Sequence, residues 1–450
     1  MFIGRQKELA ELNTAYNRDV FQSALIYGKH HIGKTALIRE FVRDKNCIWL
    51  NIPEMNEKMI LRSVSGSLRE QLGDEALPDF DVWEHVMETL IEQCELERYV
   101  IVINEPQHAT AASKNFLHVL QSSIDNHLAD SRSFLILVTS DTSFVRDQIL
   151  SAFSYCHVQI ELKEFNYLEA YEFLKSYSHK NALFLYACIG GSPFYLSEID
   201  SSISVLGNLE RFFFKDKGRL YENPSQTLMR ELREQALYNS ILYAIASGEE
   251  QLNNLSPLIG EDQSKILKYI KMMRDFGILE RSTPYGDDPV KGRKGLYTFI
   301  ENGSRFWFKY VIDGKGVDKV DINDSFFEKP FEQICTQYLQ IQNERGKLPF
   351  TVSEFGRWWG STGKRDAQPE IDIVAADETG KQAILCECKW SGKPVTSEEV
   401  VTLTEKEDLI NGIEDTQFIF FSRPGYATET KKSYKLNPCV QLLDLKDLFI

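Results

Sequence analysis

The first third of the chain alternates short apolar runs with segments of helical spacing. The apolar runs are ALIYG (24–28), CIWLNI (47–52), YVIVIN (99–104), SFLILVTS (133–140) and HVQIEL (157–162). Apolar runs without polar interruption are typical of parallel strands that are covered on both faces. We therefore predict an α/β domain with a parallel sheet over residues 1–165. A small helical lid is predicted over residues 166–225, with a turn at 190–193.

The pattern changes twice more toward the end of the chain. Over residues 226–313, three helix-like segments that stop at glycines precede two strand-like segments, ILERSTP and GLYTFI. Three helices and a hairpin predict a winged helix-turn-helix. Residues 325–450 show a helix, a strand hairpin with DETG at its turn, a second helix and two further strands. This order predicts a separate C-terminal α/β domain.

Length and composition fit a multi-domain protein of the cytoplasm. The chain has 450 residues, 43% of them hydrophobic, and no apolar run approaches the roughly 20 residues of a membrane span. The first residues, MFIGRQKELAEL, lack the features of a signal peptide. The eight cysteines form no CxxC pair, which favours free thiols in a reducing compartment. We therefore expect a cytoplasmic protein that does not contact a membrane.

Residues 28–35 read GKHHIGKT, which matches the phosphate-binding pattern G-x-x-x-x-G-K-[ST]. The segments ALIY before it and TALIREFV after it supply the strand and the helix that such a loop needs. Lys34 is expected to reach the β- and γ-phosphates of ATP, and the Thr35 hydroxyl is expected to ligate Mg²⁺. The residues expected to bind the nucleotide here are Gly28, Lys29, His30, His31, Ile32, Gly33, Lys34, Thr35 and Ala36.

The strand YVIVIN is expected beside this loop, and the residues at its end carry the hydrolytic chemistry. Glu105 is placed to polarise the attacking water. Asn104 stands where a nucleotide hydrolase normally has an Asp, and an amide brings no negative charge to Mg²⁺. We therefore expect weak Mg²⁺ dependence and slow turnover, unless Asn104 merely ends a core strand. Ser140, at the end of SFLILVTS, is either a sensor of the γ-phosphate or only a strand end.

Several segments together resemble the archaeal-type AAA-related P-loop ATPases, in particular those with a winged helix and a C-terminal nuclease-like domain. These segments are FIGRQKEL (2–9), GKHHIGKT (28–35), INE (103–105), LKEFNYLEAYEF (162–173) and IGGSPFYL (189–196). The resemblance implies a bound ATP. It also implies that Ile3, Gly4 and Arg5 lie near the adenine base.

The sequence departs from this family at three places. Asn104 replaces an acid, and His30 and His31 lie in a loop that is usually rich in arginine. The segment LSAFSYCHVQIEL (150–162) lacks the arginine that usually precedes the LKEF-like strand. The resemblance therefore does not imply an arginine-finger mechanism for this chain.

Basic residues outnumber acidic ones across residues 264–294, although the whole chain carries a net charge of −15. A recognition helix with a basic wing is a common way to contact duplex DNA. The residues expected to bind DNA are Lys265, Lys268, Lys271, Lys291, Arg293 and Lys294. The same pattern would arise in a domain that only joins two others and has a solvated charged face.

The segment EIDIVAADETGKQAILCECKW places acids on two neighbouring strands. Asp372 lies on the first strand, and Glu387 and Lys389 lie two residues apart, hence on one face of the second. This is the PD-(D/E)xK arrangement of the restriction-endonuclease-like fold, and Glu332 on the preceding helix matches an extra acid of that fold. Asp372 and Glu387 are expected to hold Mg²⁺, and Lys389 to orient water or stabilise negative charge.

Together these features favour an ATP-controlled protein that acts on DNA, with a metal-dependent nuclease-like tail. One alternative is a signalling ATPase whose nucleotide state gates a protein partner or a homo-oligomer, with an inert tail. Another is a DNA-binding regulator. DNA-stimulated ATP hydrolysis would favour the first of these three functions.

Overall fold

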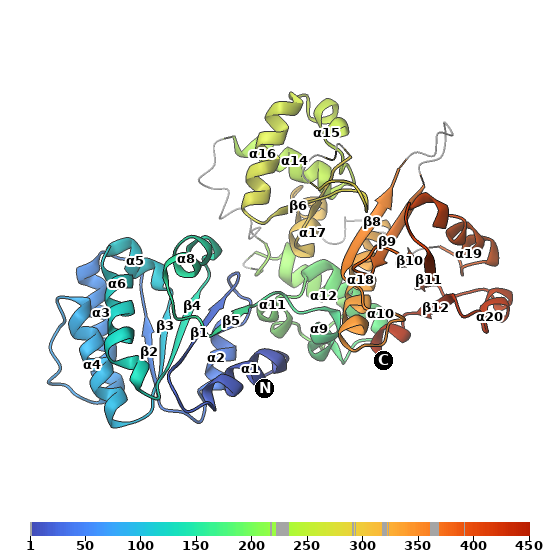
Figure 1. The fold of residues 1–450 in the computed structure, drawn as a ribbon. Helices are drawn as coiled ribbons and strands as arrows, with labels where there is room; N and C mark the ends of the chain where they lie inside the picture. The colour runs from blue at the N-terminus through green and yellow to red at the C-terminus, as the bar shows by residue number, and fades with distance from the viewer. Residues whose placement is uncertain are drawn as a thin grey trace. The chain divides into compact units, whose positions relative to one another are not determined.

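The computed structural model describes residues 2–216, 218–221, 234–289, 292, 294–316, 322, 324–360, 369–390 and 392–450. The described chain forms two compact units. One unit runs to Phe165 and also includes Ser192–Phe194, and the other contains Asn166–Gly191 and Tyr195–Ile450. Each unit contains one five-stranded sheet, and the second unit also holds a two-stranded sheet (Figure 1).

The sheet of the first unit is entirely parallel, in the order β2-β3-β4-β1-β5. Its strands are β1 (Gln22–Tyr27), β2 (Cys47–Asn51), β3 (Val100–Asn104), β4 (Phe134–Thr139) and β5 (Val158–Glu161). The five apolar runs of the sequence therefore all form strands, and the predicted parallel α/β domain is confirmed. β3 does not pair with β1, because β4 lies between them.

Helices cover both faces of this sheet. They are α1 (Gln6–Tyr16), α2 (Lys34–Phe41), α3 (Glu57–Leu72), α4 (Trp83–Leu96), α5 (Pro106–Ala112), α6 (Phe116–Asn126), α7 (Thr142–Phe144) and α8 (Leu150–Ala152). Buried residues of α3, α4 and α6 form one core with the sheet, and those of α1 and α2 form a second core with it. Because both faces are covered, the central strands β1, β3 and β4 are buried over most of their length, whereas β2 and β5 alternate with less buried residues.

The second unit begins with helices and a hairpin. The helices are α9 (Tyr167–Leu174), α10 (His179–Ile189), α11 (Pro193–Ser197, whose first two residues belong to the first unit), α12 (Val205–Leu209), α14 (Gln235–Ala246), α15 (Leu252–Ile259), α16 (Gln263–Asp275) and α17 (Asn302–Tyr310). Between α16 and α17, β6 (Leu279–Ser282) pairs antiparallel with β7 (Leu296–Phe299). Three helices and a hairpin thus follow one another in the expected order. We call α14 to α17 with this hairpin the helix–hairpin region.

The remainder, which we call the tail, contains the second five-stranded sheet, in the order β12-β11-β10-β9-β8. Its elements are α18 (Glu328–Glu344), β8 (Glu354–Trp359), β9 (Glu370–Ala376), β10 (Gln382–Lys389), α19 (Ser397–Thr404), β11 (Asp415–Ser422), α20 (Thr428–Tyr434) and β12 (Val440–Asp444). β8, β9 and β10 run antiparallel, whereas β10, β11 and β12 run parallel. Strand β8 was not expected from the sequence.

The described residues contain no helix that is both long and apolar enough to cross a membrane. All eight cysteines lie in the described part of the chain and are free thiols. Lys291 and Arg293, two of the residues expected to bind DNA, lie outside the described residues.

Candidate nucleotide site and carboxylate cluster

The loop between β1 and α2 has a backbone that requires glycine at two positions. Gly28 has φ 144°, and a Cβ there would lie 2.4 Å from the carbonyl oxygen of Leu162. Gly33, with φ 94°, leads directly into the helix that begins at Lys34. Non-glycine residues rarely adopt such angles. The two glycines therefore allow the sharp bends of the loop, which leads directly into the first turn of α2.

Lys34 lies inside this loop, and its side chain is almost fully buried. Its Nζ donates hydrogen bonds to the carbonyl oxygens of Gly28 at 2.7 Å and Lys29 at 2.9 Å, and to Ser140 Oγ at 2.8 Å. Burial lowers the pKa of Lys34, while the charge of Glu105 acts in the opposite direction. The loop thus holds one ammonium group at the position where a phosphate-binding lysine is expected.

Glu105 is connected to Lys34 through Ser140. Ser140 donates to Glu105 Oε1 from its hydroxyl at 2.8 Å and to Oε2 from its backbone N–H at 3.1 Å, and Gln107 donates to Oε2 at 2.6 Å. Burial alone would raise the pKa of Glu105, but these hydrogen bonds and Lys34 outweigh it and lower the pKa. The carboxylate is therefore ionised at neutral pH. The position of β4 between β1 and β3 explains why Ser140 can contact both groups.

Asn104 belongs to an amide network at the end of β3. Its Nδ2 donates to Asn51 Oδ1 at 3.1 Å, and the indole N–H of Trp49 donates to the same oxygen at 2.9 Å. The parallel register of β2 and β3 places Asn51 and Asn104 side by side. The side chain at position 104, next to Glu105, is thus a neutral amide that Asn51 holds in place.

The N-terminal segment contacts the phosphate loop through Arg5. Arg5 donates to the carbonyl oxygen of Ile32 at 3.2 Å and to that of Lys163, and its guanidinium lies 4.5 Å from the ring centroid of Phe165. A Cβ on Gly4 would lie 2.8 Å from the same ring. These contacts tie the start of the chain to the phosphate loop, while contacts of residues 3–5 with a base stay a prediction.

The middle of the loop packs against a distant turn. The His31 ring stacks on Phe194, with 4.4 Å between the ring centroids, and Ser192 Oγ donates to the His31 carbonyl oxygen at 3.1 Å. The side chain of Ile32 is buried in the core, so only its backbone is available to a ligand. Lys29, His30, Thr35 and Ala36 are exposed.

The tail brings together three of the predicted acids. Asp372 on β9 is buried, and its Oδ2 accepts a hydrogen bond from the Cys388 backbone N–H at 2.8 Å. Burial and the nearby charges of Glu332 and Glu387 raise the pKa of Asp372 well above its usual value. Burial also raises the pKa of Glu332 on α18, although Lys329 lies 3.2 Å from its carboxylate.

The basic partners of this cluster differ from the expected ones. Lys389 forms an ion pair with Glu399 on α19, whereas Lys406, just after that helix, donates to Glu387 Oε2 at 2.9 Å and to the Glu370 carbonyl oxygen at 2.8 Å. Lys406 was not expected from the sequence. It lies 17 residues beyond Lys389 in a polar stretch, where only the folded chain shows its contact.

The donor set of the cluster suits a hard cation only in part. Carboxylate oxygens are the ligands that Mg²⁺ prefers, and buried carboxylates with raised pKa values would be stabilised by a cation. Among the described residues, however, no group of three or more His, Cys, Asp or Glu side chains is arranged to hold a metal ion. Asp372 and Glu387 would therefore need water or substrate oxygens to complete a coordination shell.

The lysines of α16 differ in their surroundings. Lys265 lies 3.1 Å from Glu234 and 3.0 Å from Glu261, so two carboxylates compensate its charge. Lys268 and Lys271 are exposed on the same helix, and Lys294 is exposed before β7. Lys268 and Lys271 are thus better placed than Lys265 to contact phosphates.

Residues 2–199 match the family model of an ATPase domain predominantly from Archaea. The chain contains an archaeal-type ATPase domain. Residues 308–404, which include Glu332, Asp372, Glu387 and Lys389, match a family described as Archaea bacterial proteins of unknown function.

Other proteins resemble the chain over longer stretches. An uncharacterized protein of Methanocaldococcus jannaschii is 24% identical over 461 residues, which cover 99% of this chain and 100% of that protein. The Walker-type ATPase of Pyrococcus abyssi covers 68% of this chain and 96% of its own, with 14% identity and a TM-score of 0.49. The Aeropyrum pernix Orc1 protein in complex with DNA covers 68% of this chain and 93% of its own, with 13% identity and a TM-score of 0.36.

Substitutions at Asn104 and Glu105 test the hydrolytic roles within the ATPase domain. Glu105→Gln is expected to lower ATP turnover roughly 10²-fold or more, because general-base catalysis contributes about 10²–10⁴. Asn104→Asp is expected to raise turnover about tenfold, because it supplies the missing charge to Mg²⁺, although it gives up the hydrogen bond that Asn104 donates to Asn51 Oδ1. Steady-state phosphate release measures both. An Asp variant no faster than wild type would show that the amide is not the limiting group.

Proposed function

We propose that the chain is an ATP-controlled, DNA-acting protein whose tail contains a metal-dependent phosphodiesterase centre. The observation that carries this proposal is the burial of Asp372 near the charges of Glu332 and Glu387, which together raise its pKa. Buried acids held together cost free energy, and they occur at functional sites more often than chance would give. A bound cation would relieve this cost.

The ATPase domain supports the control function. The buried ammonium of Lys34 and the ionised Glu105, bridged by Ser140, fit binding of ATP with Mg²⁺. The neutral Asn104 fits slow hydrolysis, because the ion would be one negative charge short. The ATP-bound state is then long-lived, which suits a protein whose nucleotide sets its state rather than one that consumes ATP rapidly.

The tail supports the phosphodiesterase function through its element order and its acids. A helix, an antiparallel run of three strands, a helix and a parallel strand fit the restriction-endonuclease-like fold. Mg²⁺, when bound, polarises the phosphodiester and activates water. Asp372 and Glu387 would hold the ion, and Glu332 would supply the extra acid of this fold. Lys389 or Lys406 would stabilise the charge that develops on the phosphate.

The direct test is a cleavage assay with several forms of DNA. Purified protein is incubated with linear, supercoiled and single-stranded DNA, with and without ATP and with Mg²⁺ or Mn²⁺. We expect cleavage of at least one form only with a divalent ion, and a different rate with ATP. If no form is cut under any condition, the tail is not a phosphodiesterase.

The helix–hairpin region supports contact with DNA as a winged helix. The double variant Lys268→Ala/Lys271→Ala is expected to flatten the salt dependence of duplex binding, since each lost phosphate contact reduces the log–log slope by about 0.9. Lys265→Ala should change the slope less, because Glu234 and Glu261 already compensate that charge. Fluorescence anisotropy at several salt concentrations measures the slope. A slope equal to that of wild type in the double variant would assign this helix face to solvent.

A second candidate function is a nucleotide-gated switch with an inert tail. The ion pairs of Lys389 with Glu399 and of Glu387 with Lys406 favour it, because both predicted active groups have protein partners. Nucleotide binding with neither DNA affinity nor cleavage would support this function. A protein partner or a homo-oligomer would then receive the signal.

A further inference from the structure

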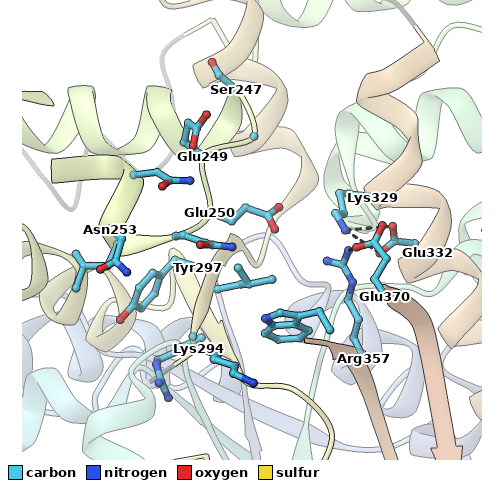
Figure 2. A pocket seen from close by; sticks show the side chains of 18 of the residues that line it. Ser247, Glu249, Glu250, Asn253, Lys294, Tyr297, Lys329, Glu332, Arg357 and Glu370 are labelled. Carbon is cyan, nitrogen blue, oxygen red and sulfur yellow. Dashed lines mark hydrogen bonds and ion pairs between the residues drawn. The ribbon is translucent and has the colours of Figure 1, made fainter. Parts of the chain in front are cut away.

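The second unit contains a cavity of about 1150 Å³ between the helix–hairpin region and the tail. Figure 2 shows Glu250 and Tyr297 on one side and Lys329, Arg357 and Glu370 on the other. A smaller cavity of about 230 Å³ is lined by several of the same residues, including Arg305 and Arg357, and also by Asp372. The large cavity therefore leads toward the carboxylate cluster.

Two cations of α17 line the large cavity side by side. Arg305 and Lys309 lie one helical turn apart, at 5.0 Å and 5.6 Å from the ring centroid of Phe326. Within the described residues, neither side-chain cation has a hydrogen bond or an ion pair. Burial lowers the pKa of Arg305, and the charges of Glu250 and Glu332 act against this without forming an ion pair with it. Burial and the charge of Arg305 lower the pKa of Lys309, while Glu328 acts against this.

These cations differ from others in the cavity wall. Arg357 lies 2.5 Å from Glu370, and Lys329 pairs with Glu332, so protein acids compensate those charges. Two neighbouring cations that lack such partners repel each other and are stabilised by an anion placed between them. The wall formed by α17 is thus suited to a phosphate group.

The tail supplies an aromatic ring to the same cavity. Trp359, at the end of β8, is half-buried and lines the cavity, and the guanidinium of Arg357 lies 5.9 Å from its ring centroid. Cations that follow a backbone together with an aromatic ring are the combination that binds single-stranded nucleic acid. A duplex, whose bases are stacked on one another, offers no free base to such a ring.

We propose that this cavity binds a single-stranded polynucleotide. Arg305 and Lys309 hold its phosphates, Trp359 stacks on a base, and the strand leads toward Asp372. The proposal rests on the proposed function in one respect, since it identifies the substrate of the same centre. The binding itself needs no metal ion.

The test is therefore a binding measurement without cleavage. Fluorescently labelled oligo-dT, oligo-rU and a mixed-sequence duplex are titrated with full-length protein in EDTA, at several salt concentrations. We expect the Lys268→Ala/Lys271→Ala variant, which lacks the two exposed lysines of α16, to bind at least one single strand more tightly than the duplex. The two single strands show whether DNA or RNA is preferred.

The variants separate the two walls. Arg305→Gln/Lys309→Gln is expected to weaken single-strand binding and to reduce the log–log salt slope by about 1.4, which is about 0.7 for each lost contact. Trp359→Ala is expected to weaken binding about tenfold with an unchanged slope, because stacking is not ionic. The matched control is Lys431→Gln/Lys432→Gln, which removes the same charge from exposed positions on α20.

Failure of the cavity to bind a single strand can be distinguished from absence of phosphodiesterase activity. Binding as tight as wild type in both cavity variants, or equal losses in the α20 control, would overturn the proposal. If the double variant unfolds, the single variants Lys309→Gln and Trp359→Ala still decide. Hydrolysis of bis(p-nitrophenyl) phosphate with Mn²⁺ tests the centre without the cavity, so a protein that binds no strand but cleaves this ester would refute only the cavity.

Discussion

Lys34→Ala is expected to weaken ATP binding about 10²-fold or more. The ammonium is the buried cation of the phosphate loop, and a hydrogen bond to a charged group is worth about 1.5–3 kcal/mol. Its present acceptors are two backbone carbonyl oxygens and a hydroxyl, which a phosphate could replace. Titration with a fluorescent ATP analogue measures the loss.

A control on the same helix makes this result specific. Arg39→Ala removes an exposed cation of α2 and should leave the affinity within about twofold of wild type, because surface charges contribute little. Equal affinities of wild type and Lys34→Ala would refute the assignment of residues 28–35 as a phosphate loop. Equal losses of ATP affinity in both variants would mean that the loss does not come specifically from the Lys34 ammonium.

Asp372→Asn is expected to lower DNA cleavage roughly 10²–10³-fold and to stabilise the metal-free protein. Loss of one transition-state interaction costs about that factor in rate. The Asn side-chain oxygen can still accept the hydrogen bond from the Cys388 N–H, so local structure should persist. Glu378→Gln, an exposed acid on the turn of the same hairpin, is the matched control and should change neither property.

The stabilisation should depend on pH with a defined sign. Because the folded protein raises the pKa of Asp372, its protonated form is favoured in the fold. The stability linked to this group is therefore fully present below the pKa of an unfolded Asp, about 3.9, and is lost as pH rises through the folded value. At pH 8 the Asn variant should exceed wild type by more than about 1 kcal/mol, the worth of one pKa unit.

Chemical denaturation in EDTA at pH 5 and pH 8 measures this difference. Glu332 and Glu387 act on Asp372 in the same direction, while Arg357 opposes them. Mn²⁺ should raise the stability of wild type and leave the variant nearly unchanged, since the ion offsets the buried charge. Identical pH dependence of wild type and variant would show that Asp372 is not the strained group.

The sequence predicted strands that have an apolar run or a regular alternation of buried and exposed residues, and it missed one that has neither. All five apolar runs of the ATPase domain form strands. Strand β8, EFGRWW, is only partly buried along its length, so it has neither an apolar run nor strict alternation. A strand is recognised in a sequence by its pattern of buried residues, and β8 has no such pattern.

Contacts between distant residues set the rest of the candidate site, and these have no local signal. The order of the sheet, with β4 between β1 and β3, follows from the packing of the whole domain and places Ser140 between Lys34 and Glu105. Lys406 reaches Glu387 only because α19 turns the chain back toward β10. The spacing of the acids within one hairpin could be predicted from the sequence. The cations that form ion pairs with them could not.

The turn Ser192–Phe194 belongs to the compact unit of the ATPase domain, although the chain on both sides of it belongs to the other unit. An expressed fragment that ends at Phe165 would therefore lose the ring stacked on His31 and the hydroxyl bonded to its carbonyl oxygen. It would also lose Pro193, whose ring lies close to Gly33. The smallest fragment that keeps the phosphate loop supported extends past Phe194, as does the family match to residue 199. A protease cut near residue 166 would accordingly leave the N-terminal product in contact with a turn that belongs to the C-terminal product.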